Sequence, residues 1–328
     1  MKFQLKSKDV QQLFLLVPLL FECTKIISLS NDHNSLMNNS DENDFLKLDF
    51  DRLWKGRENV TAVESGIIKS LLGNRHFGRI LEVGAGNGRL TNNLIKYCDN
   101  YYALDKISNF LEKINIKSGI FKVACDLEFT PFRDGVFDVI LMVRVLNFIE
   151  NPAISIKELH RILKPGGILI LSFYHTGSIA DLFDIIINQR TEKNIWARRS
   201  RDKKRVKRSN FREFFFKKSY IHRILSDENL FINKAASSGL EDYLFLKKLP
   251  PAIFIKLSHF LGRGFIAPHT FFSVLNKESI SDIDDDGNLF RCIKCKQSIE
   301  INQSEFNYET KCPSCGHKII FNNGVLLP

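Results

Sequence analysis

No stretch of this sequence is apolar for long enough to cross a bilayer as a helix. The longest apolar run near the N-terminus covers residues 13–21, whereas a spanning helix needs about 20 apolar residues, and Pro18 interrupts this run. Lysines precede it, as in a signal peptide, but no small-x-small cleavage pattern follows, and Glu22 and Lys25 flank it closely. We therefore expect a packing or membrane-surface segment and no transmembrane segment.

Cysteine is scarce as well, with seven in 328 residues, and no internal repeat occurs. Three cysteines are isolated in the sequence, and we expect them to be buried or partly buried thiols: Cys23, Cys98 and Cys125. The other four form a C-x2-C-x16-C-x2-C arrangement: Cys292, Cys295, Cys312 and Cys315. This spacing is typical of a zinc ribbon, in which four thiolates bind one tetrahedral ion.

A site of four thiolates is closed, so the predicted zinc is structural. The C-terminal part, of about 40 residues, is too short to bury a core unaided, and the metal would supply most of its folding energy. Chelation is then expected to unfold residues 288–328 and leave the rest folded. Two disulfides or redox pairs are the alternatives; disulfides need an oxidising compartment, and a redox pair normally lies at a helix start near a βαβ unit.

The most informative stretch is a glycine-rich segment after the mostly apolar run at residues 80–83, which reads as a buried strand. Three alternating glycines follow this run: Gly84, Gly86 and Gly88. Such a turn between a strand and a helix lets a nucleoside-bearing ligand lie against bare backbone. The spacing differs from the dinucleotide pattern G-x-G-x-x-G, because Arg89 occupies the third-glycine position.

Further apolar runs follow at regular intervals, separated by helical stretches. We expect strands at 80–83, 101–104, 121–125, 137–142, 168–172, 230–236 and 270–276. The second ends in Asp105, about twenty residues after the glycine turn, where a carboxylate suits both ribose hydroxyls. Asp126 and Leu127 close the third. The pattern predicts an α/β fold with a doubly wound, mostly parallel seven-stranded sheet and helices on both faces.

In these landmarks the chain resembles the class I (Rossmann-like) S-adenosylmethionine (SAM)-dependent methyltransferases of the methyltransferase type 11 kind. The resemblance covers residues 50–277 and includes the turn Pro165-Gly166-Gly167 before the fifth strand. It implies SAM as cofactor, lying over residues 84–88 with Ala85 among them, and a cytoplasmic protein, with a membrane-peripheral position as the alternative. In such enzymes an acid at the place of Asp126 accepts from the adenine amino group, and its neighbour Leu127 packs on the ring.

Two roles remain open for Glu82, which precedes the first glycine by two positions. It would anchor the turn or reach the methionine amino group of SAM through water. The catalytic residue is unknown from the sequence, because many relatives carry a histidine where this chain has Asn147. Tyr174 and His175 are the nearest titratable candidates, although a histidine beside a strand end is more often structural.

Two motifs that are missing from the sequence argue against two classes of methyl acceptor. Enzymes that methylate exocyclic amino groups of bases usually carry (D/N)-P-P-(Y/F) after the fourth strand, where this chain has Met-Val-Arg-Val at 142–145. Cytosine-C5 enzymes need a nucleophilic cysteine, commonly in a Pro-Cys pair, which does not occur here. The first expectation is a small molecule or a glycan or lipid precursor. An RNA methyltransferase and a non-catalytic SAM-binding scaffold are the alternatives.

The positive charge is concentrated in one segment. The net charge is +10, and residues 189–223 contain fourteen lysines and arginines against three acids. The densest part is Arg198–Arg208, with aromatic residues interleaved nearby: Trp196, Phe211, Phe214, Phe215 and Phe216. Three interpretations stay open, namely a lid that contacts RNA or phosphate, a solvated basic loop, and contact with an anionic membrane surface.

The composition divides the chain into four parts. These are an apolar segment with a flexible linker (1–49), the methyltransferase domain (50–278, with a basic and aromatic cap at about 176–225), an acidic linker (279–287) and the zinc ribbon (288–328). The linker acids match the opening of an EF-hand loop, but Ile293 stands where the closing Glu is required. The sequence does not say whether the ribbon contacts substrate, the core or a partner.

Overall fold

The computed structural model describes residues 54–114, 119–176, 203–208, 211–241, 249–262, 267–277, 288–301 and 307–328. The predicted N-terminal segment 1–49, the basic residues 198–202 and the acidic linker 279–287 lie outside these ranges. Within the ranges, no helix is long and apolar enough to cross a membrane.

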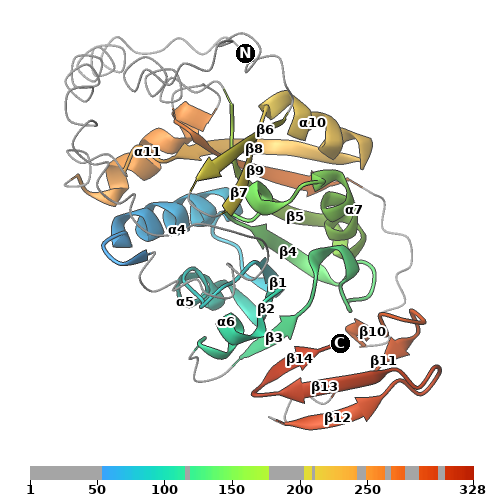
Figure 1. Ribbon diagram of the computed structural model, residues 1–328. Coiled ribbons are helices and arrows are strands. Elements are labelled where there is room, and N and C mark those ends of the chain that lie inside the picture. Colours follow the sequence, from blue (N-terminus) through green and yellow to red (C-terminus); the bar gives the residue numbers. More distant parts are fainter. Residues whose placement is uncertain are drawn as a thin grey trace, which may run out of the picture.

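The predicted seven-stranded sheet is present. Its members are β1 (Phe77–Val83), β2 (Cys98–Asp105), β3 (Ile120–Ala124), β4 (Phe137–Met142), β5 (Leu163–Tyr174), β8 (Leu230–Ser238) and β9 (His269–Asn276). They are ordered β3-β2-β1-β4-β5-β9-β8 (Figure 1). The pairs from β3 to β5 are parallel, and β9 is antiparallel to both β5 and β8. This confirms the doubly wound, mostly parallel fold class.

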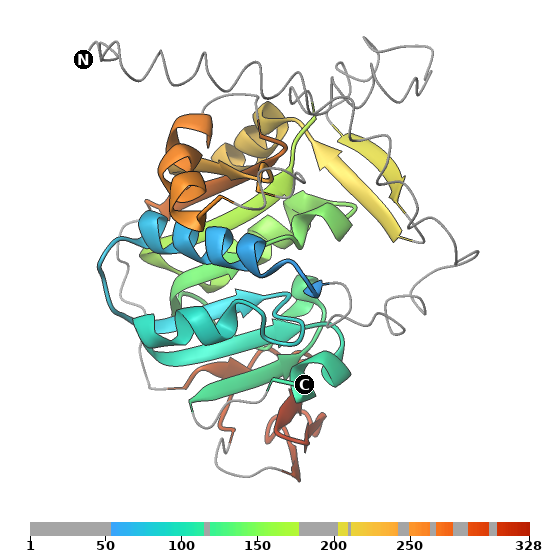
Figure 2. The same cartoon turned by 90° about the vertical axis from the view of Figure 1, so that its left-hand side faces the viewer.

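Helices cover both faces of the sheet, as predicted. They are α4 (Glu58–Leu72), α5 (Thr91–Leu94), α6 (Ser108–Glu112), α7 (Pro152–Ile162), α10 (Lys218–Asp227) and α11 (Pro251–Gly262), with the short turns η2 (Ile95–Tyr97), η3 (Leu127–Phe129) and η4 (Leu146–Phe148). One face carries α4, α5, α6 and α11, and the other carries α7 and α10 (Figures 1 and 2). In α4 the buried Val60, Val63, Ile67 and Leu71 recur every three or four residues, which gives the helix its apolar face.

The sheet continues beyond β3 into the C-terminal part of the chain. There β14 (Val325–Leu327) pairs with β3, followed outward by β13 (Lys318–Asn322) and β12 (Tyr308–Lys311). A separate small sheet joins β10 (Phe290–Arg291) and β11 (Ser298–Ile299). The C-terminal part, residues 288–328, is called the ribbon below. Of its strands, β14 lies directly against β3, the edge strand of the seven-stranded sheet (Figure 1).

A two-stranded hairpin stands beside the carboxyl ends of β4 and β5. It consists of β6 (Lys203–Arg208) and β7 (Phe211–Phe216), which pair antiparallel. Phe214, Phe215 and Phe216 of β7 are buried, and a bridge joins Phe216 to His175. The sequence predicts a cap in this region but no strands, so the hairpin was not predicted.

Candidate functional site

The glycine turn after β1 forms a bare stretch of backbone at the carboxyl edge of the sheet. All three glycines are in the left-handed region, with φ of 67° at Gly84, 55° at Gly86 and 85° at Gly88. A Cβ atom at Gly84 would clash with Val145 Cγ2. The backbone N–H groups of Gly84 and Ala85 donate to Leu104 O of β2 at 2.7 and 3.0 Å. The turn therefore has no room for larger residues and is held against the neighbouring strand.

Asp105, the last residue of β2, faces this turn. Its Oδ2 accepts the N–H of Gly86 at 2.9 Å, and its Oδ1 accepts the N–H of Ile107 at 3.0 Å. Burial raises the pKa of Asp105, while the N–H groups of Ile107, Gly86 and Lys106 act against that rise. The carboxylate thus bridges the glycine turn and the start of the next helix.

Asp126 and Leu127 lie at the end of the adjacent strand. Asp105 pairs with Ala124 in the β2–β3 register, so the two acids share one edge of the sheet. Asp126 caps η3 through a hydrogen bond from Glu128 N to its Oδ1 at 3.0 Å, and its Oδ2 lies 3.4 Å from Lys106 Nζ. Leu127 is buried, with 8% of its surface exposed. The structure therefore brings the predicted ribose and adenine residues to the same edge as the glycines.

Glu82 is buried beneath the turn. Its Oε2 accepts hydrogen bonds from Thr91 Oγ1 at 2.5 Å and from the Tyr101 hydroxyl at 2.8 Å. Burial raises the pKa of Glu82, and the two hydroxyl donors oppose that rise. These bonds tie β1 to the start of α5 and to β2.

A second polar cluster surrounds Glu64, which is fully buried on the apolar face of α4. Its Oε1 accepts a hydrogen bond from Arg144 Nε at 2.6 Å, and its Oε2 lies 2.7 Å from Arg89 Nη2. Burial alone would raise the pKa of Glu64, but the attraction of Arg144 and Arg89 outweighs burial and lowers the pKa from 4.5 to about 2. The carboxylate is therefore ionised and paired inside the protein.

Arg144 connects this carboxylate to the end of β5. Its φ is 61°, and its backbone N–H donates to Ser172 Oγ at 3.0 Å. Its Nη1 donates to the Tyr174 hydroxyl oxygen at 2.6 Å. The Trp54 ring lies 3.9 Å from the Arg89 guanidinium and 5.3 Å from that of Arg144. The segment before α4 is thus joined to the residues that follow β4.

No role at the site was predicted for Glu64 or Arg144. One signal was present, because the spacing of α4 places Glu64 among the apolar positions Val60, Ile67 and Leu71. An acid on an apolar face needs a buried partner. The identity of that partner could not be read from the sequence, since Arg144 lies 80 positions away along the chain.

The weak catalytic candidates lie under the β6–β7 hairpin. Tyr174 stacks on Phe215, with ring centroids 5.3 Å apart, and its backbone N–H donates to Asn147 Oδ1 at 3.3 Å. His175 is buried, and its Nδ1 lies 3.0 Å from Thr270 Oγ1. Burial, with a smaller effect of nearby positive charge, lowers the pKa of His175 to about 3. A histidine with such a low pKa is neutral and holds a proton weakly.

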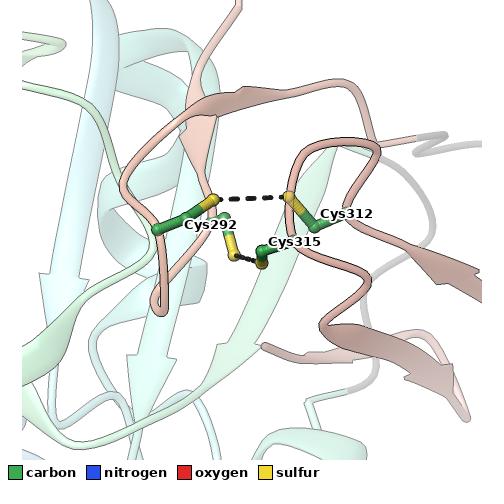
Figure 3. A group of neighbouring side chains, drawn as sticks. Cys292, Cys312 and Cys315 are labelled. Carbon is green, nitrogen blue, oxygen red and sulfur yellow. Dashed lines mark hydrogen bonds between the residues drawn. The ribbon is translucent and has the colours of Figure 1, made fainter.

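The four predicted metal ligands come together in the ribbon. Their sulfur atoms all lie within 4.8 Å of one another (Figure 3). The Sγ atoms of Cys292 and Cys315 are 3.7 Å apart, and those of Cys295 and Cys312 are 3.6 Å apart. Among the residues that the structure describes, these four cysteines form a group whose ligand atoms lie close enough together to hold a metal ion. A set of four close cysteine sulfurs is the donor set that zinc prefers.

Two tight turns with the same hydrogen-bond pattern present these cysteines. In the first, Cys292 N donates to Gln297 O at 2.8 Å and Lys296 N donates to Cys292 O at 2.9 Å. In the second, Cys312 N donates to His317 O at 2.8 Å and Gly316 N donates to Cys312 O at 2.9 Å. Each turn also has one residue in the left-handed region, Lys296 with φ 64° and Gly316 with φ 69°. The repeated geometry gives two equivalent halves of one site.

The isolated cysteines that the structure describes are buried or partly buried, as the sequence predicts. Cys98 is buried and Cys125 is partly buried, and both are free thiols. Burial raises the pKa of Cys98 to about 12 and also raises the pKa of Cys125. Cys23 lies outside the described residues.

Comparison with known proteins shows which class of fold this chain has. Residues 81–171 match the family model described as a methyltransferase domain. A crystal structure from Listeria monocytogenes, described as that of a candidate S-adenosylmethionine dependent methyltransferase, superimposes with a TM-score of 0.50 at 15% identity and covers 66% of this chain and 98% of its own. The sheet order, the glycine turn and this match define the class I methyltransferase fold. Residues 81–171 thus match a methyltransferase domain, and they lie within a fold of this class.

Curated relatives share only part of their length with this chain. The uncharacterised protein MJ1123 of Methanocaldococcus jannaschii is 40% identical over 94 residues, which cover 29% of this chain and 43% of that protein. The ubiquinone/menaquinone biosynthesis C-methyltransferase UbiE of Stutzerimonas stutzeri is 29% identical over 143 residues, which cover 40% of this chain and 52% of that protein. The chain therefore spans about half the length of these relatives, or less.

Proposed function

We propose that the protein transfers a methyl group from SAM to a small molecule or to a glycan or lipid precursor. The observation that carries this proposal is the pairing of Asp105 with the Gly86 N–H, 2.9 Å apart, at the edge that also bears Asp126. A carboxylate fixed beside bare glycine backbone suits a ribose, and a second acid on the next strand suits an adenine amino group. Bound SAM would supply a methyl group on a sulfonium, and the neutral thioether formed when its C–S bond breaks is a good leaving group.

Each predicted cofactor residue receives a role in this proposal. Asp105 accepts from the ribose hydroxyls, Asp126 accepts from the adenine amino group, and Leu127 packs on the adenine ring. The backbone of residues 84–88, including Ala85, lies against the nucleoside and the methionine. Glu82 anchors the turn through Thr91 and Tyr101. Because methyl transfer from a sulfonium is an in-line displacement, much of the catalysis comes from holding the two reactants in line.

Two observations support an acceptor of low molecular mass. The relatives include UbiE and a rice protein named 2-methyl-6-phytyl-1,4-hydroquinone methyltransferase 1, and their names describe quinone and hydroquinone pathways. In this chain the hairpin places the buried rings of Phe214 and Phe215 beside Tyr174 and Asn147. Aromatic side chains with a few fixed polar groups beside them are typical of a small-molecule site. Tyr174 remains the candidate for contact with the acceptor, and His175 is the weaker one.

An RNA acceptor is the second candidate, because β6 is strongly basic. Five of its six residues are lysine or arginine, and the strand forms the outer part of the hairpin beside the carboxyl ends of β4 and β5 (Figure 2). Cations beside an active site attract phosphate groups. The same charges suit an anionic membrane surface, at which a lipid precursor would be found.

Transfer of tritiated methyl groups from SAM into cell extract tests these candidates. The extract is separated into small-molecule, lipid, RNA and protein fractions, and the Asp105→Asn protein serves as the matched control. We expect label in the small-molecule or lipid fraction. Label in RNA alone would replace the first candidate by the second, and no label in any fraction despite SAM binding would indicate a scaffold.

We also propose that Cys292, Cys295, Cys312 and Cys315 hold one structural zinc ion. The support is the sulfur cluster and the two matching turns. A closed site of four thiolates leaves no position for a substrate, so the metal would stabilise the ribbon. Elemental analysis should find one zinc per chain and none after Cys312→Ser combined with Cys315→Ser. Purified wild-type protein without zinc, but with disulfides between the cysteine pairs, would overturn this proposal.

A further inference from the structure

We infer that the ribbon positions the adenine side of the SAM site, so that metal binding at the four cysteines strengthens SAM binding. This inference rests on the proposed function and on the proposed metal site. It concerns the loop formed by residues 126–130, which begins with Asp126 and contains η3. Both ends of that loop contact the ribbon, through two different ribbon strands.

The first contact is at the strand that leads into the loop. β14 pairs in parallel with β3, with Val325 opposite Lys122 and Leu326 opposite Val123. Both Val325 and Leu326 are fully buried. β3 would be the edge of the seven-stranded sheet without this pair. The ribbon therefore fixes the strand that ends two residues before Asp126.

The same ribbon strand also reaches the glycine turn. Val325 belongs to a small buried cluster with Ala85, Ala103, Leu111 and Ile114. Ala85 lies in the turn that would carry SAM, and Leu111 lies in α6, which follows Asp105. A shift of β14 would therefore disturb packing beneath both the adenine side and the turn.

The second contact is at the segment that follows the loop. Arg291 N donates to Pro131 O at 2.7 Å, and Arg133 N donates to Leu289 O at 3.0 Å. These two bonds flank a bridge between Phe132 and Phe290. The start of β10 is thus hydrogen-bonded to the exit of the loop.

An aromatic cluster joins the two contacts. The Phe290 ring lies 5.0 Å from that of Phe121 in β3 and 5.6 Å from that of Phe132, and Phe321 of β13 lies 5.4 Å from Phe121. Phe290 and Phe132 are almost fully buried. Burial of such rings is worth several kcal/mol, so this contact is a substantial part of the packing around the loop.

The metal ligands connect the two ribbon strands that make these contacts. Cys292 directly follows β10, and Cys312 lies between β12 and β13, which pairs with β14. A segment of about 40 residues usually needs a metal to keep its fold. Loss of the metal would therefore release both ends of the loop at once, and Asp126 and Leu127 would lose their fixed positions.

The test measures SAM affinity of the full chain by equilibrium dialysis in the zinc-loaded and the chelator-stripped forms. We expect the loaded protein to bind SAM and stripping to weaken binding by at least about fivefold, within the usual range of coupling between two sites. Hydrogen exchange should show loss of protection at residues 120–133. Equal affinity in both forms would overturn this inference alone. Failure of the loaded protein to bind SAM would overturn the proposed function as well.

A pair of matched variants gives a result even if stripping unfolds the whole protein. Phe290→Ala removes the ring between the ribbon and the loop but keeps all four cysteines. Phe254→Ala in α11 removes a similarly buried ring far along the sheet. With zinc content confirmed in both, Phe290→Ala should weaken SAM binding at least about fivefold more than Phe254→Ala. Equal affinities of the two variants would show that the ribbon does not position the loop.

Discussion

The Gly86 N–H donates to Asp105 Oδ2 across the space between the first and second strands of the sheet, at 2.9 Å. The bond holds a carboxylate at the place where a ribose would lie. It also requires the backbone of Gly86 to keep φ near 55°, a conformation that residues with a Cβ rarely adopt.

Gly86→Val is therefore expected to abolish SAM binding while the protein stays folded. A β-branched residue at this φ is strained, and its side chain would occupy the bare backbone that a nucleoside needs. Isothermal titration with SAM and circular dichroism measure the two properties. Gly166→Val is the matched control, because Gly166 also has positive φ but lies away from the turn. Micromolar affinity in Gly86→Val would contradict the assignment.

Asp105→Asn should keep the fold and weaken SAM binding by about 10- to 150-fold, the effect of losing hydrogen bonds to a charged group worth about 1.5–3 kcal/mol. The amide can accept on one atom only, so it cannot serve both ribose hydroxyls and the two backbone N–H groups. Asp99→Asn in the same strand changes an exposed acid and should leave the affinity unchanged. Wild-type affinity in Asp105→Asn would remove this residue from the site.

Glu64→Gln should lower the free energy of unfolding at pH 7 by about 3–5 kcal/mol, because it leaves two partly buried guanidiniums without their anion. The folded pKa of about 2 lies below the unfolded value of 4.5. The stabilisation is therefore complete above pH 4.5 and is lost as the pH falls toward 2.

Chemical denaturation at pH 7 and at pH 3.5 measures both effects. The difference between the wild type and Glu64→Gln should be smaller at the lower pH. Glu150→Gln, at an exposed acid, should show neither effect. An unfolding free energy of Glu64→Gln equal to that of the wild type at pH 7 would show that the buried ion pairs do not stabilise the protein.

Chelation of the metal should destabilise the whole domain and not residues 288–328 alone. The sequence favoured an independent ribbon, but β14 belongs to the main sheet, and Phe290 and Phe321 belong to its hydrophobic core. Hydrogen exchange in β1 and β2 of stripped protein measures this, and we expect the free energy of unfolding to fall by at least about 3 kcal/mol. Unchanged protection in both strands would support the independent ribbon instead.

Much of the fold could be predicted because its signals are local. Residues 137–142 form an apolar run interrupted only by Asp138, and the structure has a strand with those bounds. The four cysteines were recognisable from their spacing alone. Val325–Leu327, by contrast, is a strand of three residues, too short to show a period, and its partner lies some two hundred positions earlier. The partners of Glu64 could not be predicted either, because they are distant along the chain and nothing in the sequence indicates which cations pair with Glu64.

The pairing of β14 with β3 has one more consequence. Without β14, β3 with its apolar Phe121 and Val123 would be an edge strand, and its unpaired N–H and C=O groups would be open to pairing with another chain. The ribbon covers that edge and presents β12 in its place, which carries the charged residues Glu309 and Lys311. A fragment cut at the acidic linker would expose the bare edge of β3, and copies of it would associate strand to strand. We therefore expect the ribbon to protect the main sheet from aggregation.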